Sequence, residues 1–276
     1  MTNEHRLPER VVAALACPVC GDGLSRQDAA LRCARGHSFD VARQGYVNLL
    51  AGTGSARAGT ADTAAMVADR ADFLAAGHYA PLAALVAERV GTPDGLIVEA
   101  GAGTGYYLAA TLDRRPGAVG LALDVSPAAL RRAARAHDRL GAVGWDVWRP
   151  WPVRDGVADV VLDVFAPRNG PQFHRVLRPG GLLVVVIPEA DHLAELGKAA
   201  GLLAVDPHKP ERLADTLGDR FDLLDSTPLR YPMTLPPADV SRVVGMGPAG
   251  HHARPVESGG PRSVTASFLV SRYRVR

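Results

Sequence analysis

Short apolar runs, each followed by a polar or glycine-rich turn, recur along the chain. They predict strands at 96–98, 119–123, 143–147, 157–164, 182–187, 221–229 and 263–274. Helical spacing between the first five predicts helices at 106–112, from Pro127 and at 171–177, and another from Asp191. Repeated strand–helix alternation is typical of α/β proteins, so we expect a parallel, doubly wound sheet covered by helices on both faces.

Three segments outside this alternation have patterns of their own. Residues 62–77 and those from Pro81 predict two helices that lead into the first strand. Residues 51–60 are small and glycine-rich, which favours a hinge or disordered loop. Residues 231–261 carry six prolines and the pair His251-His252, and suit either a substrate-covering loop or a plain surface loop.

The first strand of the alternation runs directly into a turn with three glycines. Glu99 sits at the strand's carboxyl end, and Gly101, Gly103 and Gly105 allow a sharp turn under a ligand. A dinucleotide fingerprint would need a further glycine at position 106, where the chain has Tyr106. The turn therefore predicts a nucleotide-type cofactor other than NAD.

Acids follow the later strands at the same predicted edge. Asp124 lies 19 residues beyond Gly105, where a carboxylate can accept two ribose hydroxyls. Asp146 could accept from an adenine amino group, although a surface acid between Trp145 and Trp148 fits its sequence equally well.

The N-terminal 40 residues hold all three cysteines of the chain. Cys17, Cys20, Cys33 and His37 form the spacing C-x2-C-x12-C-x3-H, which suits two turns presenting ligands to one tetrahedral ion. Four protein ligands would leave no open position, so we predict one structural zinc ion. A module this small also needs the metal to fold.

Composition narrows the class of protein without naming a partner. With 276 residues and 47% hydrophobic content, the chain can bury a full core. We find no apolar leader and no run long enough to span a membrane, so we expect a cytoplasmic protein. The 31 basic and 29 acidic residues nearly balance, and the total charge does not demand a nucleic-acid partner.

Taken together, these motifs resemble one known family. Glu99-x-Gly101-x-Gly103-x-Gly105 is similar to the first motif of seven-strand S-adenosylmethionine-dependent methyltransferases, and Arg-Pro-Gly-Gly at 178–181 supports this. The cysteine motif, the block at 39–50, Ala-Gly-His-Tyr at 76–79 and Val-Phe-Ala-Pro-Arg-Asn at 164–169 resemble the 23S rRNA guanine-N1 methyltransferases, which include the tylosin-resistance enzyme. The resemblance covers nearly the whole chain.

The resemblance implies a division of labour along the chain. A zinc-binding RNA-recognition module would occupy 1–50, a loop and linker helices 51–95, and a seven-strand Rossmann-like S-adenosylmethionine methyltransferase domain 96–276. Tyr79, Gly103, Thr104 and His192 match cofactor contacts of the family, and Asp124 matches its ribose acid. The family also implies a homodimer, a 23S rRNA hairpin as partner and a role in rRNA processing, and it raises macrolide resistance as a role.

The expected chemistry is attack of guanine N1 on the methyl group of S-adenosylmethionine. Phe165 is a candidate to stack on the flipped base, and Arg168 and Asn169 to contact the base or its phosphate; core packing is the competing interpretation of Phe165. Asp163 is a candidate base for the N1 proton, against a simple pairing with Arg168.

Two other functions remain compatible with the sequence. One is a small-molecule methyltransferase in which zinc only caps the fold. The other is a non-catalytic RNA-binding module that keeps the cofactor fold. Arginines near the cysteines are candidate phosphate contacts under the RNA-binding interpretations: Arg26, Arg32, Arg35 and Arg43.

Overall fold

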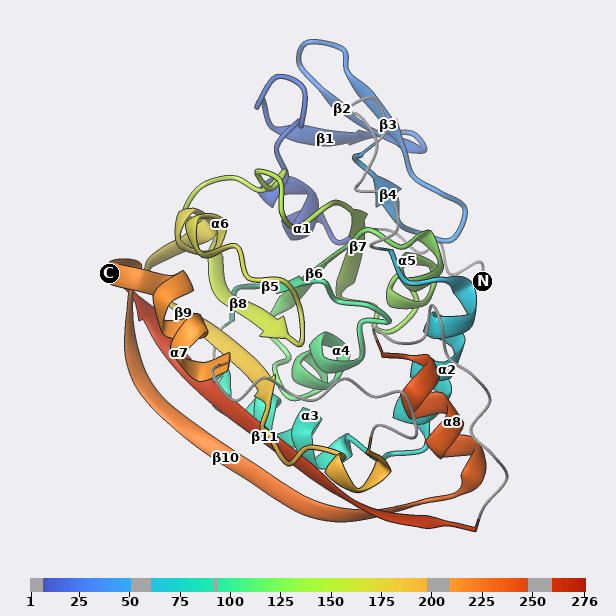
Figure 1. The fold of residues 1–276 in the computed structure, drawn as a ribbon. Helices are drawn as coiled ribbons and strands as arrows, with labels where there is room; N and C mark the ends of the chain where they lie inside the picture. The colour runs from blue at the N-terminus through green and yellow to red at the C-terminus, as the bar shows by residue number, and fades with distance from the viewer. Residues whose placement is uncertain (1–6, 51–60, 92–93, 198–208, 248–259) are drawn as a thin grey trace.

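A computed structural model describes residues 7–50, 61–91, 94–197, 209–247 and 260–276. Its centre is an eight-stranded sheet in the order β10-β11-β9-β8-β5-β6-β7-β4 (Figure 1). The strands are β4 (Val47–Asn48), β5 (Leu96–Ala100), β6 (Val119–Asp124), β7 (Leu140–Gly144), β8 (Ala158–Val164), β9 (Leu177–Pro188), β10 (Phe221–Leu235) and β11 (Arg262–Val275). Seven of them follow the predicted alternation, and β4 adds an eighth at one edge.

Alternation of side chains along the strands builds two cores, one on each face. On β5, Leu96 and Val98 join one core, whereas Ile97 joins the other. On β9, Leu183 and Val185 belong to the first core, whereas Val184 belongs to the second. Strands buried on both faces explain why the sequence shows continuous apolar runs instead of apolar–polar alternation.

Helices cover both faces, as predicted. On one face lie α1 (Glu9–Ala14), α6 (Gly170–Val176) and α7 (Lys209–Leu217), whose buried residues belong to the first core. The second core takes residues of α2 (Ala64–Ala75), α3 (Ala80–Arg89), α4 (Tyr106–Asp113), α5 (Pro127–Ala133) and α8 (Pro237–Gly245). Among the described residues, no helix is both long and apolar enough to cross a bilayer.

The N-terminal segment forms a small ribbon that is joined to the large sheet. Strands β1 (Leu24–Gln27), β2 (Ala30–Cys33) and β3 (Ser38–Asp40) form an antiparallel sheet that stands at the top of Figure 1. The chain then enters the large sheet, because Val47 and Asn48 of β4 pair in parallel with Val143 and Gly144 of β7. The block at 39–50 thus connects ribbon and sheet.

Four expectations of the sequence are corrected. The sheet is mixed, because β11 runs antiparallel to both β9 and β10. The third strand of the alternation is 140–144, so Asp146 lies beyond its end. Between Asp191 and residue 197, where the described segment stops, the chain forms only the short 3-10 helix η1 (Ala194–Leu196) instead of an α-helix, and 3-10 helix η3 (Gly218–Arg220) follows α7.

The fourth correction concerns the proposed substrate-covering loop. Residues 231–235 continue β10 and 237–245 form α8, so much of that segment is regular structure. Residues 248–259 of that segment, including the pair His251-His252, lie outside the described residues. The predicted hinge at 51–60 also lies outside them.

Candidate active site and metal centre

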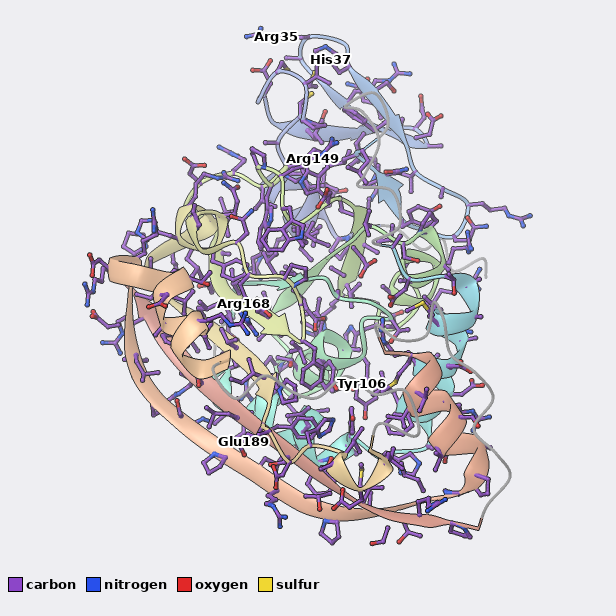
Figure 2. The ribbon with its side chains drawn as sticks, viewed as in Figure 1. Arg35, His37, Tyr106, Arg149, Arg168 and Glu189 are labelled. Carbon is purple, nitrogen blue, oxygen red and sulfur yellow. The ribbon has the colours of Figure 1, made fainter. Side chains whose placement is uncertain are left out.

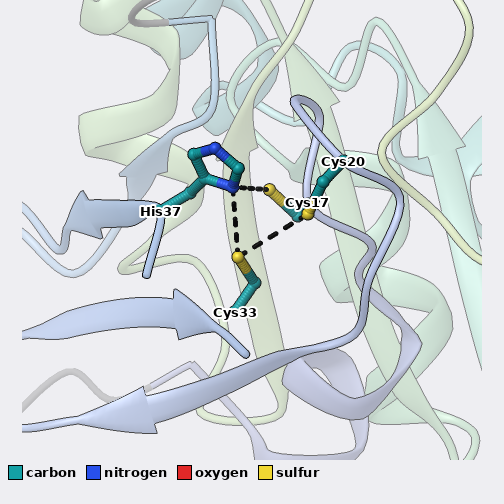
Figure 3. Close-up of side chains that lie close together, drawn as sticks. All are labelled: Cys17, Cys20, Cys33 and His37. Carbon is teal, nitrogen blue, oxygen red and sulfur yellow. Dashed lines mark hydrogen bonds between the residues drawn. The ribbon is translucent and has the colours of Figure 1, made fainter. Parts of the chain in front are cut away.

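The ribbon brings the four predicted metal ligands together (Figure 3). The Nδ1 atom of His37 lies 3.2 Å from Sγ of Cys33 and 3.6 Å from Sγ of Cys17, and the sulfurs of Cys20 and Cys33 are 3.7 Å apart. Tetrahedral zinc with ordinary bond lengths places such ligand atoms about 3.5 to 3.8 Å apart. The donor set and its spacing fit one closed zinc site.

The glycine turn requires its glycines for two different reasons. Gly101, Gly103 and Gly105 all have positive φ, between 56° and 76°, which L side chains rarely adopt. At Gly101 a Cβ atom would also lie 2.8 Å from Cβ of Ala166, so the turn packs against the loop after β8. Thr104 is half-buried in this turn. The turn therefore joins the ends of β5 and β8.

Asp124 is held at the end of β6 by backbone donors. Its two carboxylate oxygens accept from the backbone N–H of Gly103 and of Ser126, each at 2.8 Å. Burial raises the pKa of Asp124, while these N–H groups act to lower it. Asp124 thus faces the glycine turn, as a ribose-binding acid requires.

Two further acids are buried at the same edge with incomplete hydrogen bonding. Burial raises the pKa of Glu99 and that of Asp163 each to about 8. One oxygen of each carboxylate, Oε2 and Oδ2, has no hydrogen-bond partner. A buried polar atom without a partner costs free energy, so the edge is built for a polar ligand.

Phe165 follows β8 with a strained backbone and an exposed ring. Its φ is 58°, an unusual value for a bulky residue, and its side chain is 43% exposed. The ring meets Phe268 of β11 at 5.6 Å and Tyr107 of α4 at 6.2 Å between centroids. Strained exposed residues cluster at functional sites, so this geometry favours a stacking role over core packing.

Tyr79 and His192 come together from segments 113 residues apart. The hydroxyl of Tyr79 lies 3.1 Å from Nε2 of His192, and both rings contact Phe268. Nδ1 of His192 accepts from the backbone N–H of Ser267 at 3.2 Å, which places the proton of a neutral ring on Nε2. His192 then donates to Tyr79, whose own hydroxyl proton is available to a ligand. Burial keeps the pKa of Tyr79 far above its usual range.

The remaining predicted residues lie in two loops beside this cluster. Asn169 caps α6 by accepting from the backbone N–H of Gln172 at 3.4 Å, and its amide donates to the carbonyl of Val147 at 2.9 Å. Asp146 is buried and accepts from the backbone N–H of Trp148 at 3.0 Å. Arg168 lies near the centre of the view in Figure 2, and its Nε is buried without a partner.

Comparisons with known proteins decide the family. A family model of the N-terminal RlmA zinc ribbon matches residues 15–52. A 23S rRNA (guanine-N1)-methyltransferase homologue of Micromonospora griseorubida is 49% identical, over 94% of this chain and 97% of its own. The chain belongs to the 23S rRNA guanine-N1 methyltransferase family.

Another relative and a solved structure support the assignment. The 23S rRNA (guanine(748)-N1)-methyltransferase of Streptomyces fradiae is 49% identical, and the match covers 90% of each chain. A methyltransferase of Bacillus halodurans has the same fold, with a TM-score of 0.51 and 16% identity, over 70% of this chain and 97% of its own. The predicted methyltransferase fold and RlmA-type zinc ribbon are confirmed.

Sequence reasoning missed two residues that organise the site. Phe268 is fully buried in β11 and gathers the rings of Tyr79, His192 and Phe165, yet its sequence context is an ordinary strand. Arg70 of α2 pairs with Asp62 and donates to the carbonyl of Met246 at 2.7 Å, and its guanidinium lies next to Gly103 of the glycine turn. Neither role has a sequence signal, because the aromatic partners of Phe268 and the Met246 carbonyl that Arg70 contacts are distant along the chain.

Proposed function

We propose that this protein transfers a methyl group from S-adenosylmethionine to N1 of a guanine in a hairpin loop of 23S rRNA. Two relatives with 49% identity over nearly the full chain bear that activity in their names. The observation that carries the proposal to particular residues is the exposed, left-handed Phe165 beside the glycine turn.

The residues at the carboxyl edge fit S-adenosylmethionine. Asp124 would accept the ribose hydroxyls, and the unpartnered oxygen of buried Glu99 suits a polar or cationic group of the ligand. Gly101, Gly103, Thr104 and Gly105 supply a turn under it, and Asp146, Tyr79 and His192 complete the proposed binding set. When bound, the cofactor supplies an activated methyl group and leaves as a neutral thioether.

Positioning supplies much of the rate in such a reaction. The new bond joins guanine N1 to the methyl carbon, the carbon–sulfur bond breaks, and the N1 proton is lost to a base. The ring of Phe165 would stack on the extruded guanine, and Arg168 would contact the base or its phosphate. These interactions orient N1 toward the methyl group.

Asp163 remains the candidate for the base that takes the N1 proton, provided that the guanine can reach its carboxylate. A pKa of about 8 suits a group that takes a proton near neutral pH. Its carboxylate has no exposed surface, however, and accepts from the backbone N–H of Ala166 at 3.3 Å. Direct transfer to Asp163 therefore requires the loop 164–167 to move when RNA binds. Among the described residues, Asp163 and Arg168 do not form a direct hydrogen bond, so the pairing predicted for them is not a hydrogen-bonded one.

Asn169 differs from its sequence-based expectation. Both ends of its amide are engaged within the protein, one in capping α6 and one on Val147. We therefore propose that it positions the loop that precedes α6, and that Phe165 and Arg168 in that loop contact the RNA.

The zinc ribbon is proposed to recognise the hairpin. Arg35 lies at its outer end beside His37 in Figure 2. We extend the family expectations of a homodimer and a cytoplasmic location to this protein, since ribosomal RNA is made and assembled in the cytoplasm of bacteria. Macrolide resistance is a proposed consequence of modifying the loop.

Transfer of labelled methyl groups to unmodified 23S rRNA tests the proposal. The wild-type protein should label the RNA, and a Gly103→Val variant, whose branched side chain does not tolerate the left-handed backbone, should not. A small-molecule methyltransferase and a non-catalytic RNA-binding module both predict an unlabelled RNA.

A further inference from the structure

Two aromatic side chains are exposed by more than a third among the described residues, and the proposed reaction uses only one of them. They are Phe165, at 43%, and Trp148, at 49%. The other tryptophans, Trp145 and Trp151, are only 4% and 3% exposed. A single exposed apolar side chain is common on protein surfaces, so a role for Trp148 depends on where its loop holds it.

The loop that carries Trp148 is fixed to the loop that carries Phe165. Asn169, four residues after Phe165, donates to the carbonyl of Val147, and Gln172 of α6 accepts from the backbone N–H of Trp151 at 2.8 Å. The indole of Trp151 donates to the carbonyl of Val147 at 3.0 Å. These hydrogen bonds therefore fix the turn that carries Trp148 beside the proposed methyl-transfer site.

The same turn contains the proposed adenine-binding acid. Oδ1 of Asp146 accepts from the backbone N–H of Trp148, so the contact does not involve the indole. The indole can be replaced without removing the hydrogen bond that shapes the cofactor side of the turn.

Position and charge point to RNA as the occupant. In Figure 2, Arg149 lies between Arg35 of the zinc ribbon and Arg168 beside β8. A guanidinium group next to an exposed indole is the combination that binds single-stranded nucleic acid, in which bases stack and phosphates pair with cations. An apolar protein partner would not require an arginine directly after the exposed aromatic residue, whereas Arg149 follows Trp148 in the same turn.

We propose that Trp148 is a second stacking platform, which holds an unpaired nucleotide of the hairpin loop while Phe165 holds the target guanine. This inference rests on the proposed function, because it assumes an RNA substrate. Holding a neighbouring nucleotide apart from the target would keep the loop open and fix which guanine reaches the methyl group.

The test compares RNA affinity in three variants, using a synthetic hairpin that contains the loop around the guanine named in the Streptomyces fradiae relative. Trp148→Ala should weaken hairpin binding about 5- to 150-fold, the range for removing one base-stacking aromatic. Trp148→Phe should keep most of the affinity, and Trp148→Leu should lose as much as Trp148→Ala. The matched control Leu223→Ala, at an exposed apolar position on β10, should bind like the wild type.

Two readouts separate stacking from a structural role. Affinity for S-adenosylhomocysteine should change less than twofold in Trp148→Ala, because the Asp146 contact uses the backbone. Hairpin binding should quench the tryptophan emission of the wild type and not that of Trp148→Phe.

Three results would overturn the inference: equal hairpin affinity in wild type and Trp148→Ala, full affinity in Trp148→Leu, or a change of oligomeric state as the only effect. If the wild type neither binds nor methylates the hairpin, the proposed function itself fails. That outcome is distinct from a wild type that methylates RNA with no contribution from Trp148.

Discussion

The left-handed backbone of Phe165 leads us to predict that two truncations of its side chain differ in stability. Truncation to alanine or to glycine removes the same ring, of which slightly more than half is buried. That buried part is about 115 Å² of a side chain of about 200 Å², so both variants lose about 3 kcal/mol of hydrophobic stabilisation. The two variants differ only in what they do to a backbone with φ of 58°.

Glycine should be the more stable of the two variants. A left-handed conformation raises the free energy of an L residue by about 1 to 2 kcal/mol, and glycine adopts it without this penalty. Part of this gain is offset because glycine has more freedom in the unfolded chain. We expect the free energy of unfolding of Phe165→Gly to exceed that of Phe165→Ala by about 1 kcal/mol. For a chain of this size, that is a difference of about 2 °C in melting temperature.

Activity should not follow stability in this pair. Both variants lack the stacking ring, so kcat/KM for methyl transfer to RNA should fall about 5- to 150-fold in each. Phe165→Tyr should retain activity, whereas Phe165→Leu should not. The measurements are thermal unfolding of the zinc-loaded protein and single-turnover methyl transfer.

Two results would refute this reasoning. If Phe165→Ala is at least as stable as Phe165→Gly, the backbone strain is not present. If Phe165→Leu methylates RNA at the wild-type rate, the ring packs without stacking on the substrate.

Three other perturbations test the remaining parts of the site. Cys17→Ser should lose its bound zinc, measured by elemental analysis, and should lose hairpin affinity more than cofactor affinity; equal losses would argue against a separate recognition module. Asp124→Ala should bind S-adenosylhomocysteine at least about 10-fold more weakly by calorimetry, because it loses charge-assisted hydrogen bonds, while the surface variant Asp222→Asn should not. Glu99 has a folded pKa of about 8, above its unfolded value, so its contribution to stability is complete below about pH 4.5 and is lost as pH rises through 8. Chemical unfolding of the cofactor-free protein should show that decline, and Glu99→Gln should make it shallower; an unchanged pH dependence would contradict the assignment.

Local pattern predicted most of the sheet and the metal site. The apolar runs for β5, β6, β8 and β9 are long enough to identify each strand, and the four zinc ligands lie within 21 residues of one another. The predicted end of β7 is wrong because Trp145 and Val147 continue the apolar pattern beyond Gly144, the last residue of the strand. These two side chains pack in the core after the strand has ended.

The local sequence pattern does not predict contacts between segments that are distant along the chain. The prolines in 232–237 suggested a loop, yet Pro232 lies in β10 at the edge of the sheet, where a missing backbone N–H is tolerated. The pairing of Tyr79 with His192 depends on β11, which supplies Phe268 and the Ser267 N–H that sets the histidine tautomer. The left-handed backbone of Phe165 has no sequence signal at all.

Reverse transcription across the hairpin loop tests the central claim most directly. N1-methylguanine blocks the Watson–Crick edge, so 23S rRNA treated with the protein and S-adenosylmethionine should give a strong stop one residue before a loop guanine. We predict that stop at the guanine corresponding to the one named in the Streptomyces fradiae relative, and its absence with Gly103→Val. Labelled RNA without a stop would contradict methylation at N1, and RNA that stays unlabelled would contradict the proposed function.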